Sequence, residues 1–136
     1  MFFYWLLQNI ESAKTTVEGI RKAILFIERN KDDKTSSLNF ILSNGKKLFA
    51  LRKGFINPDY YSLYYLNRDP KKTDISNFQS KETKLLISSK LLREEKAVII
   101  CSEKLTEDED WILIPNHSLL IVDESLNINR LNLDGE

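Results

Sequence analysis

The first thirty residues carry apolar side chains at the period of an α-helix. Between residues 2 and 12 four of them recur at spacings of three, one and three, which puts them on one helical face. These four are Phe3, Leu6, Leu7 and Ile10. A second stretch begins at Thr15 with Glu18 three positions later, as in a capping box, and its Gly19 costs up to about 1 kcal/mol. Two consecutive helices are predicted.

The hydrophobic period changes to two at residue 38. Asn44-Gly45 follows directly, and this dipeptide between alternating runs favours a hairpin, because a type I′ turn needs positive φ at both central positions. Turning on these two residues pairs Phe40 with Phe49 and Leu38 with Leu51. Cross-strand partners share a face, so the pattern predicts a hairpin with one apolar surface.

Further strand-like runs follow. Tyr60–Leu66 is rich in aromatic residues, and Ala97–Cys101 is continuously apolar, so we expect the latter to be covered on both faces. The other expected strands are 85–87, 118–122 and 127–131, and 67–83 is expected to be a polar surface loop. Helices followed by about five to seven antiparallel strands give an α+β fold. The length of 136 residues predicts a single domain over residues 1–136.

The composition of the chain excludes several classes of function. The chain has 20 basic and 20 acidic residues, so it has no bulk charge to attract nucleic acid or an anionic membrane. Its apolar start stops at Leu7 without the basic region of a signal peptide, and no run approaches the ~18–20 apolar residues of a membrane span. We expect a cytoplasmic protein that binds neither nucleic acid nor membrane. With one Cys and one His we also expect no internal disulfide, no metal site and no cofactor.

Cys101 and His117 are the candidates for nucleophilic chemistry. Cys101 ends an apolar run and has Glu103 and Glu107 nearby instead of the cations that stabilise a thiolate, so a structural cysteine is the favoured interpretation. His117 follows Pro115 and is expected on a surface turn. A dyad of the two stays open as an alternative.

Charged and aromatic clusters add no chemistry. The acidic run Glu107-Asp108-Glu109-Asp110 lacks the spacing and the glycine of a calcium loop, so a solvated loop is favoured. The basic pairs Lys46-Lys47 and Lys71-Lys72 are balanced by acids elsewhere. The tyrosines between Tyr60 and Tyr65 could stack on bases, but no basic groove accompanies them. The residues by themselves assign no catalytic, cofactor-binding or metal-binding role.

Several segments, taken in order, resemble the class II glutamine amidotransferases, and most closely a small stand-alone branch of predicted glutamine amidotransferases. The segments are Ser37–Gly45, Leu48–Arg52, Ser62–Tyr65, Ser102–Thr106, Trp111 and Pro115–Asp123. Each motif is degenerate, but their order and spacing follow the branch over about residues 2–131.

The resemblance implies a specific fold and reaction. Members are N-terminal-nucleophile hydrolases with a four-layer αββα sandwich, which hydrolyse glutamine to glutamate and ammonia through a cysteinyl acyl intermediate. Their nucleophile is a Cys after the initiator Met, an Asn-Gly pair forms the oxyanion hole, and an Asp before a helix holds the glutamine amine. Here residue 2 is Phe2, Cys101 matches no nucleophile position, and Asn44-Gly45 matches the oxyanion pair in letters only. No catalytic residue of the family is therefore carried over.

These observations lead to the hypothesis of a C-terminal half of a class II glutaminase domain, truncated or encoded as a split piece, whose catalytic N-terminal half is absent. The aromatic residues from Phe2 to Trp5 would pack against the missing half, and we expect either binding to that half or self-association. Glutamine is the substrate of the family. The alternatives are a non-enzymatic α+β interaction module and a cysteine hydrolase that uses Cys101 and His117.

Overall fold

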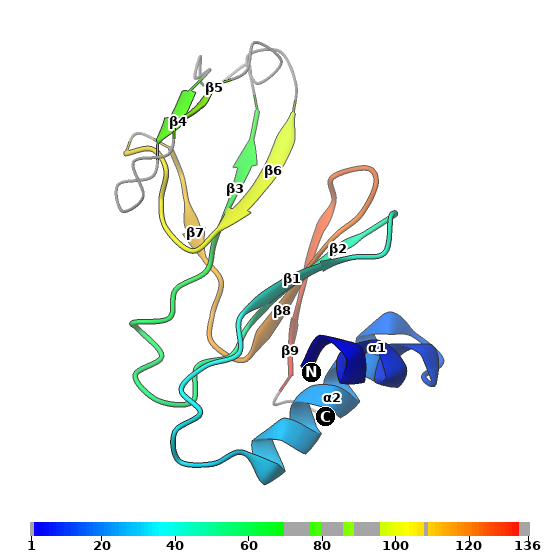
Figure 1. Ribbon diagram of the computed structural model, residues 1–136. Coiled ribbons are helices and arrows are strands. Elements are labelled where there is room, and N and C mark those ends of the chain that lie inside the picture. The colour runs from blue at the N-terminus through cyan, green and yellow to red at the C-terminus, as the bar shows by residue number, and fades with distance from the viewer. Residues whose placement is uncertain (1, 70–76, 80–85, 89–95, 108, 134–136) are drawn as a thin grey trace. The chain divides into compact units, whose positions relative to one another are not determined.

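The computed structural model describes residues 2–69, 77–79, 86–88, 96–107 and 109–133. Two compact units make up the chain, Met1–Ser36 and Ser37–Glu136. The first unit is helical and the second consists of antiparallel strands, which confirms the predicted α+β class (Figure 1).

The first unit contains helices α1 (Phe2–Glu11) and α2 (Thr16–Asn30). Thr15 caps α2, because its side-chain oxygen accepts a hydrogen bond from the Glu18 N–H at 3.1 Å. The Glu18 carboxylate in turn accepts from the Lys14 N–H at 3.2 Å. The predicted N-cap is thus confirmed, except that the Glu18 carboxylate bonds to the N–H of Lys14 and not to the N–H of Thr15.

At Gly19 the backbones of the two helices lie in close contact. A Cβ at this position would lie 2.4 Å from Cα of Ile10, so only glycine fits. The close packing of α1 on α2 offsets the free-energy cost of a glycine inside α2. Nearby, the rings of Trp5 and Phe26 lie 5.0 Å apart, while Phe3 remains exposed.

The second unit contains a four-stranded antiparallel sheet in the order β1-β2-β8-β9. Its strands are β1 (Phe40–Ser43), β2 (Leu48–Arg52), β8 (Ser118–Val122) and β9 (Ile128–Asn132). Strand β8 has the predicted bounds, and β9 starts one residue later than expected. The hairpin partner β2 is therefore a central strand, and β1 and β9 are the two edges.

The register of the β1–β2 hairpin differs from the prediction by two residues. Phe40 pairs with Leu51 instead of Phe49, so Gly45 and Lys46 form the tip of the hairpin. Gly45 has φ +86°, whereas Asn44 is not among the residues with positive φ, so the type I′ turn on Asn44-Gly45 does not form. Because the shift is an even number, the predicted apolar face is preserved.

A three-stranded antiparallel sheet has the order β6-β3-β7. Its strands are β3 (Tyr64–Arg68), β6 (Ala97–Cys101) and β7 (Ile112–Leu113). One face packs on the four-stranded sheet through a core of Ala50, Leu63, Ile114, Leu120 and Val122, which Val98 and Ile100 join. The other face packs on Leu66 and Trp111 through Ile99 and Cys101. Both faces of β6 are thus contacted, as expected, although each of its residues is only partly buried.

Two expectations for the middle of the chain need correction. The aromatic strand begins at Tyr64 instead of Tyr60, because Tyr60 closes a turn in which its N–H donates to the Asn57 carbonyl at 3.0 Å. The expected surface loop at 67–83 contains the end of β3 and strand β4 (Asn77–Gln79), which pairs with β5 (Leu86–Ser88). The remainder of that loop, with Lys71-Lys72, lies outside the described residues.

Candidate functional site

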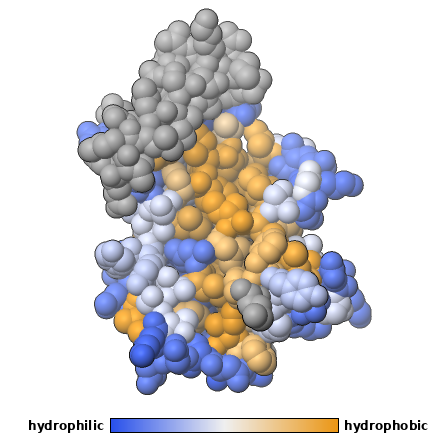
Figure 2. Space-filling model, in the orientation of Figure 1, coloured by the Kyte–Doolittle hydropathy of each residue, from blue (hydrophilic) through white to orange (hydrophobic). Residues whose placement is uncertain are grey.

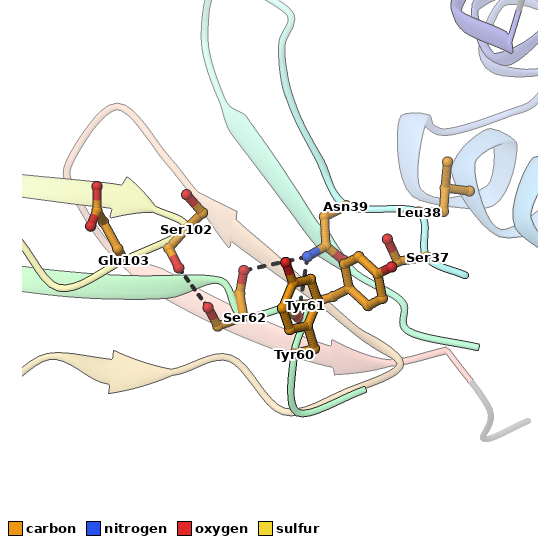
Figure 3. A pocket seen from close by; sticks show the side chains of 8 residues that line it. All are labelled: Ser37, Leu38, Asn39, Tyr60, Tyr61, Ser62, Ser102 and Glu103. Carbon is orange, nitrogen blue, oxygen red and sulfur yellow. Dashed lines mark hydrogen bonds between the residues drawn. The ribbon is translucent and has the colours of Figure 1, made fainter. Parts of the chain in front are cut away.

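A pocket of about 410 Å³ opens in the second unit beside the start of β1 (Figure 3). Three chain segments form its wall. The lining residues are Ser37, Leu38, Asn39, Tyr60, Tyr61, Ser62, Ser102 and Glu103. In Figure 3 the tyrosine rings lie toward one end and Glu103 lies at the other, with Ser62 and Ser102 between them. The rings of Tyr60 and Tyr61 meet edge to face with their centroids 5.1 Å apart.

Hydrogen bonds of Asn39 and Ser62 tie the three parts of this wall together. Asn39 Oδ1 accepts a hydrogen bond from the Lys53 N–H at 3.0 Å. Its Nδ2 donates to the carbonyls of Tyr61 at 3.3 Å and of Ser62 at 3.4 Å. Ser62 Oγ then donates to the carbonyl of Ser102 at 2.6 Å (Figure 3). The side chains of Asn39 and Ser62 therefore hold backbone segments in place.

Arg52 fixes the loop behind the pocket. The side chain is buried, and its three nitrogen groups donate to three backbone carbonyls, those of Tyr61 (2.9 Å), Ile114 (2.8 Å) and Pro58 (2.7 Å). The planar guanidinium can serve three acceptors at once, which a lysine cannot. Arg52 thus acts as a structural clamp and is not available to a ligand.

A second polar contact joins the buried Lys53 to the partly buried His117. Lys53 is 0% exposed, and its Nζ lies 3.1 Å from Nδ1 of His117. This distance is that of a hydrogen bond between the two nitrogens. His117 has φ +61°, and its carbonyl accepts from the Leu133 N–H at 2.8 Å. His117 thus lies on a turn as predicted, but its side chain is partly buried against Lys53 instead of lying on the surface.

Cys101 has the environment of a structural thiol. It is partly buried at the end of β6 against Trp111, and Sγ donates to the carbonyl of Glu103 at 3.0 Å. Burial raises the pKa of the Cys101 thiol to about 11. At neutral pH the sulfur is protonated, which agrees with the favoured interpretation of the sequence.

The structure does not unite Cys101 and His117 in a catalytic pair. The hydrogen bond of the thiol goes to Glu103 and the imidazole contacts Lys53. A nucleophile and its base should be within hydrogen-bond reach of each other. The described contacts thus give no support to a dyad.

Glu107 and Asp110 of the acidic run are exposed in a loop, as expected, whereas Glu109 turns into the protein. The Glu109 side chain is only 2% exposed, with Oε1 3.8 Å from Nε of the buried Arg68. Its Oε2 accepts from Thr106 Oγ1 at 2.7 Å, and Thr106 accepts from the Trp111 indole at 2.8 Å. Asp108 lies outside the described residues. Among those that are described, no group of three His, Cys, Asp or Glu side chains is arranged to hold a metal ion.

The remaining sequence motifs fall at other places. Asn44-Gly45 lies at the exposed hairpin tip, where Asn44 Oδ1 accepts hydrogen bonds from the Lys46 and Lys47 amides. Neither residue is among those that line the pocket beside β1. Tyr64 and Tyr65 point to opposite faces of β3 and pack in the two cores. The aromatic segment therefore does not form one stacking surface.

The pocket offers hydroxyl groups and one carboxylate to a ligand. Glu103 is the one charged side chain in the described lining, and no lysine or arginine is among those residues. A free amino acid such as glutamine carries a carboxylate that normally requires a cationic partner. The described pocket is thus incomplete as a glutamine site.

Comparisons with known proteins assign the family. No curated protein and no solved structure is similar enough to be matched. No described helix is long and apolar enough to cross a membrane. The family model for glutamine amidotransferases class-II matches residues 1–130, nearly the whole chain, in agreement with the resemblance found in the sequence. The chain belongs to the class II glutamine amidotransferases.

Proposed function

We propose that these residues form the supporting part of a class II glutaminase domain and that the nucleophile which attacks glutamine comes from a segment outside them. In this proposal the domain follows the N-terminal-nucleophile mechanism that the resemblance implies, in the cytoplasm. The described chain contributes two packed sheets and a helical pair. By itself it should bind no substrate productively and release no ammonia.

The state of Cys101 carries this proposal. The resemblance implies a cysteine nucleophile, and the sequence contains one cysteine. A reactive cysteine needs a cation or a helix N-terminus to form a thiolate. Cys101 has instead a pKa raised to about 11 by burial, and the Glu103 carboxylate also opposes ionisation. The proposal rests on this thiol and not on where the sequence starts.

Labelling with an electrophilic glutamine analogue tests the proposal. The native chain is incubated with the analogue near neutral pH, and adducts are located by mass spectrometry. We expect no labelling of Cys101 above that in a Cys101→Ser control. Stoichiometric, glutamine-protectable labelling of Cys101 would refute the structural role of this thiol and with it the proposal.

One observation favours a second function, an interaction module that needs no nucleophile. Among the described residues β1 pairs with β2 alone, and the described pocket lining contains neither cysteine nor histidine. Such a module would unfold cooperatively as an isolated chain. A chain that denatures without a cooperative transition would exclude this second function.

A further inference from the structure

The dipeptide Asn44-Gly45 at the tip of the β1–β2 hairpin has no role in either proposed function. Asn44 is the one asparagine of the chain that a glycine follows. Asparagine is a thermolabile residue, because the backbone nitrogen of the next residue can attack its side-chain carbonyl carbon. A following glycine favours this attack, since it has no side chain to obstruct the approach. The dipeptide therefore has the composition of a site for intramolecular amide chemistry.

Both residues of the dipeptide are open to solvent. Asn44 and Gly45 are exposed, and in Figure 2 hydrophilic residues project from the side of the molecule where Figure 1 shows the turn between β1 and β2. Among the described residues other than the two chain neighbours of Gly45, no heavy atom lies within 4 Å of the position that a Cβ would take there. Water can therefore reach the dipeptide, and a small product can leave it.

The hairpin tip holds the side-chain carbonyl of Asn44 in place. Oδ1 accepts hydrogen bonds from the Lys46 N–H at 3.1 Å and from the Lys47 N–H at 2.8 Å. Both bonds bend the side chain forward along the main chain, toward the residue whose nitrogen would attack. Backbone N–H groups directed at a carbonyl oxygen also stabilise the negative charge that this oxygen acquires during attack on its carbon. The tip thus favours Cγ of Asn44 as an electrophile.

The attacking nitrogen has a hydrogen-bond acceptor of its own. The Gly45 N–H donates to Oγ of Ser43 at 3.2 Å. This nitrogen must lose its proton to attack, and the exposed Ser43 hydroxyl lies on the path of that proton to water. The nucleophile and the electrophile belong to adjacent residues, so the reaction needs no encounter between molecules.

We propose that Asn44 is a site of spontaneous modification, at which Gly45 N displaces ammonia and water then generates an aspartyl or isoaspartyl residue. In the first step a bond forms between Gly45 N and Asn44 Cγ, and the Cγ–Nδ2 bond breaks. The proton of the Gly45 N–H leaves with the ammonia, and the product is a five-membered succinimide. In the second step one water molecule opens the ring at either carbonyl carbon, which leaves a carboxylate at position 44.

The modification changes the charge of the tip and, in one product, the length of its main chain. A carboxylate replaces the neutral amide next to the amides of Lys46 and Lys47. In the isoaspartyl product the main chain runs through Cγ and is one carbon longer, so the hydrogen bonds to Oδ1 cannot all be kept. The inference goes beyond the proposed glutaminase role and does not depend on it, because it uses the hairpin tip alone.

Peptide mapping by mass spectrometry tests the proposal on the full native chain, incubated at physiological temperature and mildly alkaline pH. We expect Asn44 to exchange its amide for a carboxylate faster than the other asparagines of the chain, by on the order of tenfold or more. Asn129, exposed on β9 but followed by Arg130, is the internal control. A native chain that keeps Asn44 intact for as long as Asn129 would overturn the proposal.

A comparison of the native chain with the chain in urea tests the contribution of the folded tip. We expect Asn44 to convert at least as fast in the native chain, because the two N–H donors to Oδ1 are assembled only there. Conversion in urea alone would show that the hairpin protects Asn44 and would refute the proposal.

Substitution of the following glycine tests the route of the reaction. Gly45→Ala should slow the conversion of Asn44 on the order of tenfold, because a Cβ obstructs the attacking nitrogen. Lys46→Ala, at the same exposed tip, keeps the dipeptide and the backbone N–H and is the matched control, with an unchanged rate. Circular dichroism confirms that both variants are folded. A wild-type rate in folded Gly45→Ala would exclude attack by this nitrogen.

Discussion

The side-chain amide of Asn116 makes two hydrogen bonds with the backbone of Gly54. Oδ1 accepts from the Gly54 N–H at 2.7 Å, and Nδ2 donates to the Gly54 carbonyl at 3.0 Å. Gly54 is buried, and a Cβ there would lie 2.8 Å from Cα of Pro58. This pair joins the segment after β2 to the segment before β8, which supports the fixed backbone behind the pocket.

Removing this amide should destabilise the chain. Asn116→Ala leaves the buried N–H and carbonyl of Gly54 without this partner, so we expect the free energy of unfolding to fall by about 1–3 kcal/mol. Urea denaturation measures the change. Asn129→Ala, at an exposed position of β9, is the control and should change stability little. Equal effects of the two substitutions would contradict the role of Asn116.

Arg52→Lys should be costly although it keeps the charge. A lysine ammonium cannot reach all three carbonyls that the guanidinium serves, those of Pro58, Tyr61 and Ile114. We expect a loss of about 2 kcal/mol or more in the free energy of unfolding. Arg130→Lys, at an exposed position of the edge strand β9, provides the matched control. Wild-type stability of Arg52→Lys would show that the clamp does not matter.

Gly19→Ala should reverse the usual effect of alanine in a helix. On propensity alone the substitution would stabilise α2 by about 1 kcal/mol. The added Cβ would lie 2.4 Å from Cα of Ile10, so α1 and α2 must move apart. We therefore expect a lower thermal midpoint. Arg29→Ala, exposed in the same helix, should shift it little. A higher midpoint for Gly19→Ala would contradict the close helix contact.

Alkylation of Cys101 should be slow at neutral pH and should accelerate up to about pH 11, where the folded thiol ionises. In denaturant the same reaction should reach half its maximum near the ordinary thiol pKa, since burial no longer opposes ionisation. The folded state holds its proton to higher pH, so this group's contribution to stability is present below the unfolded pKa and is lost as pH rises through the folded one. A folded-state midpoint near pH 7 would indicate an activated thiol.

Asp123 should contribute a stability that acid removes. Its Oδ2 accepts from Asn127 Nδ2 at 3.0 Å and its Oδ1 from the Asn127 N–H at 2.9 Å, and these bonds hold the pKa of Asp123 below its usual range. The contribution is therefore present above the unfolded pKa and lost as pH falls through the folded one. The difference in denaturation midpoint between wild type and Asp123→Ala should shrink below about pH 4. A difference that is constant with pH would contradict this role.

The alternation of apolar residues predicted the strands of the hairpin and the face they share, but not their register. A shift of two residues leaves every side chain on its predicted face, so the pattern cannot distinguish the two pairings. The choice depends on the backbone of the turn, where Gly45 alone of the tip residues has positive φ. Which two residues form the turn therefore depends on the backbone conformation of the folded hairpin, and the apolar pattern does not specify it.

The residues that shape the pocket were harder to predict. Arg52 lies two positions after Ala50, so alternation places it on the inner face of the sheet, which is a usable signal. Its carbonyl partners come from loops whose course the sequence does not reveal. Glu109 was assigned to a solvated loop, because its partner Arg68 is distant in sequence. Buried polar contacts across such distances depend on the tertiary fold.

Release of ammonia from glutamine by the isolated chain is the most direct test of the account. A coupled glutamate assay compares the wild type with Cys101→Ser at high protein concentration. We predict no turnover above background in either protein, because the one thiol is protonated and hydrogen-bonded at neutral pH. Glutamine hydrolysis by the wild type that disappears in Cys101→Ser would contradict the supporting role proposed for this chain.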